Sequence, residues 1–110
     1  MEEILQNALE FMDSGEDNVK NKRWNAAVSD FFKAISNFSD YLIYKEIKVF
    51  PKNHNERFQL LEKYFSSVYN KIIALFKTYR ESYNLRLKKN DALALKKYAY
   101  EIKNLVTNKK

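Results

Sequence analysis

The sequence predicts an all-α protein, an up-and-down bundle of about five helices in a single domain over residues 1–110. Apolar residues recur at steps of three and four along most of the chain, which is typical of amphipathic helices. The chain holds one Gly and one Pro, whereas an all-β domain needs many turns and usually builds them from these residues. With 45% hydrophobic residues in 110, the chain is able to bury one core.

The first two helices are expected over residues 2–22 and from residue 23 or 24 to about 48. Gly15 marks either a break in the first helix or a close approach to a neighbour. Two adjacent apolar rows run along the second helix: Ala27, Phe31, Ala34, Phe38 and Tyr41, and beside them Val28, Phe32, Ile35 and Leu42. A face this wide indicates a helix that is central or shared with another chain, which favours a homodimer.

Pro51 ends the second helix, and Asn53 with Glu56 forms a capping box that opens the third. At the pair Ser66-Ser67 the chain either bends or continues as one long helix. The second alternative is open because one apolar series runs across the pair: Phe58, Leu61, Phe65, Val68, Ile72, Leu75, Tyr79 and Tyr83. The fourth helix is expected to end near Lys88-Lys89, where cations suit the negative end of the dipole. Asn90 or Asp91 then caps a fifth helix, whose stripe is Leu95, Tyr98, Ala99, Ile102, Leu105 and Val106.

Charge is divided unevenly along the chain. Residues 1–60 carry 8 Lys/Arg and 10 Asp/Glu, a balance of −2, whereas residues 61–110 carry 12 and 4, a balance of +8. This asymmetry is typical of a surface for nucleic acid or another acidic partner. The alternative is a Lys-rich solvated face with a basic tail at residues 108–110.

Several function classes are disfavoured by what the sequence lacks. There is no Cys, so disulfides, thiolate metal sites and Cys nucleophiles are excluded. No Gly-rich phosphate loop is present, one His makes a metal site improbable, and the carboxylates are scattered. We expect no catalytic residue, no metal and no cofactor. The acidic N-terminus and the absence of an apolar run of about 20 residues predict a soluble cytoplasmic protein without a membrane association.

The candidate binding residues lie in the basic second half. Lys77, Arg80 and Asn84 share a helix face, with Arg80 and Tyr83 nearer the core. The full set for nucleic acid or another ligand is Lys77, Arg80, Tyr83, Asn84, Arg86, Lys88 and Lys89, with Lys96 and Lys97 expected in the same basic cluster. His54 is either a general base near an anion site or, as we favour, a structural residue of the first helical turn.

Aromatic residues make up 15% of the chain and invite a base-stacking hypothesis. Phe31, Phe38, Phe65, Tyr79, Tyr83 and Tyr98 stand at core spacing, and we expect most of the aromatic residues to belong to the core. Tyr44, Tyr69 and Tyr100 lie off the main stripes and are better candidates for a surface role.

The order of these features resembles HEPN domains (higher eukaryotes and prokaryotes nucleotide-binding). The stretch from Arg23 to Ile35 is similar to their second helix, and Pro51-Lys52-Asn53-His54 to the loop that opens their third. The stretch from Tyr79 to Asn84 is similar to the Arg-and-Tyr segment of their fourth helix. The resemblance implies a homodimeric bundle that acts beside a nucleotidyltransferase in toxin–antitoxin-type modules.

Some HEPN domains are ribonucleases that use an Arg followed four to six residues later by a His. Arg80 fits the Arg, but Arg86 stands six positions on and no His follows His54. The leading hypothesis is therefore a non-catalytic HEPN-like module that binds a nucleotidyltransferase-type partner, a nucleotide or RNA. The alternatives are a divergent metal-independent ribonuclease, using Arg80 with Asn84 or Tyr83 and with His54, and a plain protein-interaction bundle.

Overall fold

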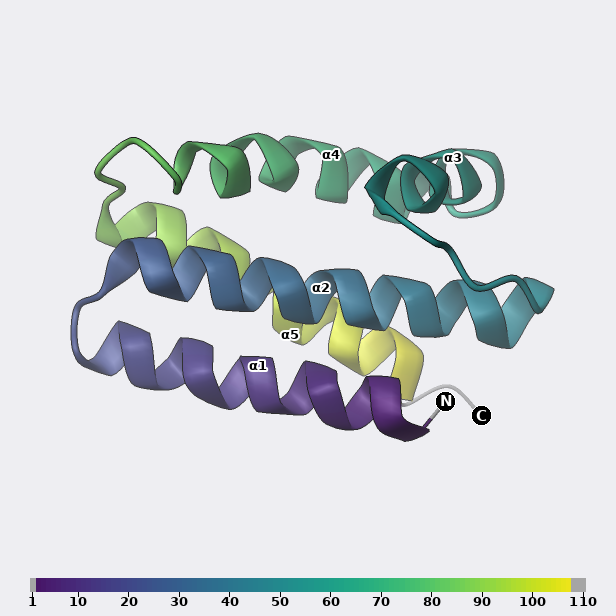
Figure 1. Ribbon diagram of the computed structural model, residues 1–110, viewed down its shortest axis with the longest axis horizontal. Coiled ribbons are helices and arrows are strands. Elements are labelled where there is room, and N and C mark those ends of the chain that lie inside the picture. Colours follow the sequence, from purple (N-terminus) through teal and green to yellow (C-terminus); the bar gives the residue numbers. More distant parts are fainter. Residues whose placement is uncertain (1, 108–110) are drawn as a thin grey trace.

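The computed structural model describes residues 2–107, so the basic tail expected at residues 108–110 lies outside the described part. Within this range the protein is all-α: α1 (Glu2–Lys20), α2 (Trp24–Ile47), α3 (His54–Tyr64), α4 (Ser66–Glu81) and α5 (Lys89–Thr107). The helices α1, α2, α4 and α5 run up and down along the long axis, while the short α3 crosses at one end (Figure 1). The predicted five-helix bundle is confirmed.

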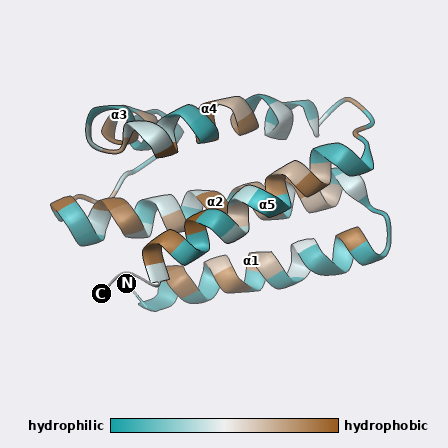
Figure 2. Ribbon diagram, turned by 180° about the vertical axis from the view of Figure 1, so that it is seen from behind, coloured by the Kyte–Doolittle hydropathy of each residue, from teal (hydrophilic) through white to brown (hydrophobic). Residues whose placement is uncertain are grey.

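The helix α2 is the centre of the bundle, because it packs against each of the other four helices. Both predicted rows are buried except for the half-buried Tyr41. Seen from behind, α5 crosses in front of α2 at an incline, and α1 runs below α2 (Figure 2). The wide apolar face of α2 is thus covered within one chain, and it gives no support to a homodimer.

The helix α1 is continuous through Gly15, which is a point of close approach and not a break. A Cβ at this position would lie 2.7–2.9 Å from three ring atoms of Phe31. Only a residue without a side chain lets the aromatic ring of α2 pack this closely. The helix ends in a Schellman arrangement, since Arg23 N–H donates to Asn18 O (2.8 Å) and Lys22, at φ 60°, donates to Val19 O (3.0 Å).

The cap of α3 forms almost as expected. The Asn53 side chain accepts from Glu56 N–H at 2.9 Å, and the Glu56 carboxylate accepts from the N–H of Lys52 and not from that of Asn53. The helices α3 and α4 are separate, and the break falls at Phe65 (φ −141°, ψ 63°) one residue before the serine pair. The apolar series continues across this break, so periodicity alone did not reveal it.

The C-terminal end of α4 differs most from the prediction. The helix ends at Glu81, and Lys88 and Lys89 lie at the start of α5, not at the end of α4. The reason is a side chain from α2: Asn25 donates to the carbonyl oxygens of Ser82 (2.9 Å) and Leu85 (2.6 Å) and accepts from Leu87 N–H (2.9 Å). These bonds satisfy backbone groups of the turn at 82–88 that would otherwise continue the helix.

Candidate nucleic-acid interface

Three of the predicted residues meet on the outer face of α4. Lys77, Arg80 and Asn84 line a shallow pocket of about 340 Å³ together with Glu81. Asn84 reaches it from the turn after the helix. Lys77 pairs with Glu81 at 3.3 Å in a largely exposed salt bridge, which contributes little to stability. The prediction that these side chains share a helix face is thus confirmed for Lys77 and Arg80, but Asn84 lies beyond the end of the helix.

Arg80 and Tyr83 lie at the surface, and the expectation that they stand nearer the core is wrong. The Arg80 guanidinium lies over the Phe76 ring, 5.0 Å from its centroid, and leaves its donors toward solvent. Tyr83 is 70% exposed because the helix has ended before it. Its hydroxyl hydrogen-bonds to that of Tyr79 at 2.8 Å. Burial and this bond raise the pKa of Tyr79 to about 12, so Tyr79 supplies no nucleophile near neutral pH.

The turn between α4 and α5 carries the other predicted residues. Arg86, Lys88 and Lys89 are exposed. Two lysines at a helix start are unfavourable for the dipole, and Asp91 offsets them: its carboxylate accepts from Lys88 N–H at 2.8 Å. Lys96 does not belong to this cluster, contrary to the prediction, because it pairs with Glu16 of α1 at 2.9 Å.

The connection between α1 and α2 lies at the same end of the bundle as the turn between α4 and α5 (Figure 1). It adds Lys20, Lys22 and Arg23, from the half of the chain whose net charge is negative. We call this surface the basic end: Lys20, Lys22, Arg23, Lys77, Arg80, Arg86, Lys88 and Lys89. Sequence reasoning missed the first three, since only the fold brings residues 20–23 to the same end of the bundle as the turn between α4 and α5 (Figure 1).

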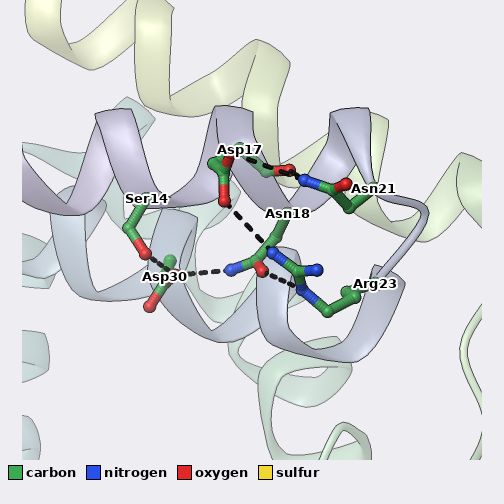
Figure 3. Close-up of polar contacts among 6 residues, drawn as sticks. All are labelled: Ser14, Asp17, Asn18, Asn21, Arg23 and Asp30. Atoms are coloured by element: carbon green, nitrogen blue, oxygen red, sulfur yellow. Dashed lines mark hydrogen bonds and ion pairs between the residues drawn. The ribbon is translucent and has the colours of Figure 1, made fainter.

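A polar network positions Arg23 (Figure 3). Its Nε donates to Asn18 Oδ1 at 2.7 Å, and its Nη2 donates to Asp17 Oδ2 at 3.1 Å. Asn18 is held in turn by Asp30, whose Oδ2 accepts from Asn18 Nδ2 at 2.8 Å and from Ser14 Oγ at 2.6 Å. The guanidinium is thus fixed by side chains of both α1 and α2.

His54 is the first residue of α3, and its ring packs in the aromatic cluster that holds Phe76 and Tyr79. Its centroid is 5.2 Å from that of Phe76 and 6.4 Å from that of Tyr79. The Arg57 Nη1 donates to His54 Nδ1 at 2.6 Å. A guanidinium only donates, so Nδ1 is the unprotonated nitrogen and its lone pair is occupied. Burial, and then the Arg57 charge, lower the pKa of His54. The structural interpretation of His54 fits this geometry best.

Arg57 is buried, and the sequence analysis did not single it out. Its Nε and Nη2 donate to the two carboxylate oxygens of Asp40 at 2.7 and 2.8 Å. Both side chains are at most 10% exposed. The pair ties α3 to α2, and an Asp flanked by the apolar residues Phe38 and Leu42 of α2 was the signal that could have found it. Asp40 is also the exception to the expected scatter of carboxylates over the surface.

The aromatic residues singled out for a surface role, Tyr44, Tyr69 and Tyr100, are all half-buried. Tyr100 donates to the Glu16 carboxylate at 2.5 Å and so joins α5 to α1. None of these three belongs to the basic end.

Among residues 2–107, no group of His and acidic side chains is arranged to hold a metal ion. The helices of this range also include none with the length and apolar character needed to cross a bilayer. No protein-family model, curated protein or solved structure matches the chain.

Proposed function

We propose that the chain is a cytoplasmic, non-catalytic HEPN-like module that binds single-stranded RNA through its basic end. The observation that carries the proposal is the convergence of cations from residues 20–23 and 77–89 on one end of the bundle. Exposed cations attract phosphate without regard to base. The exposed Tyr83 ring and the Arg80 guanidinium supply flat surfaces on which bases stack.

The test is binding of a short single-stranded RNA as a function of salt. Affinity should fall with rising salt, with a log–log slope of about 0.7 per phosphate neutralised. The variant Lys88→Glu/Lys89→Glu should weaken binding of all sequences alike. Glutamates at the start of α5 also suit the dipole, so this variant should be more stable than the parent by up to about 1 kcal/mol per site.

The matched control is Lys45→Glu/Lys63→Glu, which changes the charge equally at the end of the bundle that holds α3. Both lysines are exposed. This control should reduce affinity much less, because its charges lie away from the basic end. No binding at low salt would contradict the proposal, as would equal losses in the two double variants.

A ribonuclease is the second candidate, and one arrangement favours it. Arg80 and His54 both flank the Phe76 ring, at 5.0 and 5.2 Å. The occupied Nδ1 of His54 opposes it, because RNA cleavage needs a free proton acceptor. We therefore expect no metal-independent cleavage above a buffer control. Turnover that is lost in both Arg80→Ala and His54→Ala would overturn the non-catalytic reading.

Pairing of two copies, and of the module with a nucleotidyltransferase, is part of the proposal through the HEPN resemblance. Since α2 is covered within the chain, we assign self-pairing to the groove between α4 and α5. This groove of about 330 Å³ is lined by Val68, Tyr98, Ile102 and the 46% exposed Leu105, among others. Light scattering should give about twice 13.2 kDa, and Leu105→Glu should give the monomer mass. If the parent protein has the mass of a monomer, the proposal that two copies pair is wrong.

A further inference from the structure

A pocket at the basic end joins two parts of the chain that are far apart in sequence. It has a volume of about 310 Å³ and is lined by Lys22, Arg23, Trp24, Asn25, Ala26 and Arg86. Its lining includes three cations and one aromatic ring but no carboxylate. The pocket on α4 differs because Glu81 lies in its lining and pairs with Lys77. Here Arg23 also has an acidic partner, Asp17 at 3.1 Å, but that carboxylate lies outside the lining.

Both arginines have donors to spare within the described residues. Arg23 uses its Nε and one N–H of Nη2 on Asn18 and Asp17, which leaves three of its five N–H groups. The network behind it is firm, because Asn18 is only 8% exposed and is held by Asp30. Arg86 makes no hydrogen bond or ion pair with the rest of residues 2–107, so its whole guanidinium is available.

The backbone that carries Arg86 is held in place although its side chain is not. Asn25 bonds to the carbonyl of Leu85 at 2.6 Å and to the N–H of Leu87 at 2.9 Å, immediately before and after Arg86. Asn25 follows Arg23 by two residues, so one segment positions the guanidinium of Arg23 and the backbone of Arg86. Because these groups are positioned before binding, less entropy is lost when an anion enters.

We propose that this pocket binds the terminal phosphomonoester of a nucleotide, with the base stacked on Trp24. The inference rests on the proposed function and names the group that the basic end prefers. A volume of about 310 Å³ is at the lower end for ligand sites and suits one nucleotide better than a run of them. A monoester carries about −1.5 to −2 charges at pH 7, against −1 for an internal diester. Two arginines and Lys22 match the higher charge.

The protein holds one Trp, so its fluorescence reports this pocket alone. The free-nucleotide probes are AMP, adenosine and inorganic phosphate; the nucleic-acid probes are one short RNA with a 5′-phosphate and with a 5′-hydroxyl. AMP should quench Trp24 and bind at least about tenfold more tightly than adenosine. The 5′-phosphorylated RNA should exceed its 5′-hydroxyl form by a similar factor. Inorganic phosphate should compete with AMP without quenching.

The variant Arg86→Gln should bring the ratio between the two RNA forms close to one. Arg80→Gln, on the other face of the basic end, should weaken both forms equally and keep the ratio. A ratio that survives in Arg86→Gln would overturn the inference. RNA binding that is salt-dependent but indifferent to the terminal phosphate would overturn it too, while leaving the proposed function standing. AMP binding without any RNA binding would support the pocket as a free-nucleotide site and overturn the proposed function.

Discussion

Removing the carboxylate of Asp40 leaves the guanidinium of Arg57 buried without its partner. The two side chains are 7% and 10% exposed and are joined by two bonds, of 2.7 and 2.8 Å. Breaking a buried pair of this kind by removing one partner costs about 3–5 kcal/mol. Since a domain of this size is stable by about 5–15 kcal/mol, Asp40→Ala should lose a large part of its stability.

Urea unfolding followed by helical circular dichroism measures the effect. With a slope of about 1.5 kcal/mol per M, the midpoint of Asp40→Ala should fall by about 2–3 M. The control is the double variant Asp40→Leu/Arg57→Met, which removes both charges and should lie within about 1 kcal/mol of the parent. A loss below about 1 kcal/mol in Asp40→Ala would mean that the pair behaves as an exposed one, which would refute the role of Arg57 in tying α3 to α2.

Three further predictions concern single side chains. Burial, and then the Arg57 charge, lower the pKa of His54 in the folded state, so the unfolded chain takes up its proton first and stability should decline as pH falls below about 6.5. His54→Gln should flatten the curve of unfolding free energy between pH 5 and 7, and an unchanged curve would contradict the packing of the ring beside Arg57. Lys48 ends α2 at φ 61°, so Lys48→Gly should stabilise by about 0.5–1 kcal/mol in urea unfolding, and a loss would argue against the left-handed backbone. Ser39 is fully buried and its Oγ has no partner within residues 2–107, so Ser39→Ala should raise stability by about 1 kcal/mol in thermal unfolding; a clear loss would reveal a hidden hydrogen bond.

The helices of this fold follow from periodicity because each one buries a stripe at steps of three and four. The rows of α2 predicted its central place, and Pro51 with Asn53 predicted the start of α3. The end of α4 could not be predicted, since it depends on Asn25, a polar residue 57 positions before Ser82. Local patterns carry no information about a side chain that caps a distant helix.

Some residues of the candidate site could likewise be predicted from local spacing, and others could not. Lys77 and Arg80 were predictable because their helical spacing places them on one face of α4, whereas Asn84 reaches the same pocket from the turn after the helix. Lys22 and Arg23 were not, because they come from the acidic half and reach the basic end only through the up-and-down topology. Tyr83 was wrongly expected near the core, because the apolar series from Phe58 to Tyr83 continues past Glu81, where α4 ends.

Mapping the RNA-contacting surface residue by residue is the sharpest test of RNA binding at the basic end. Backbone amide chemical shifts should be recorded while a short single-stranded RNA is added at low salt. We expect perturbed amides to gather at residues 20–26 and 77–91, with small changes in α3 and in the C-terminal half of α2. Perturbations centred on α3 or on the groove between α4 and α5, or none at all, would contradict it.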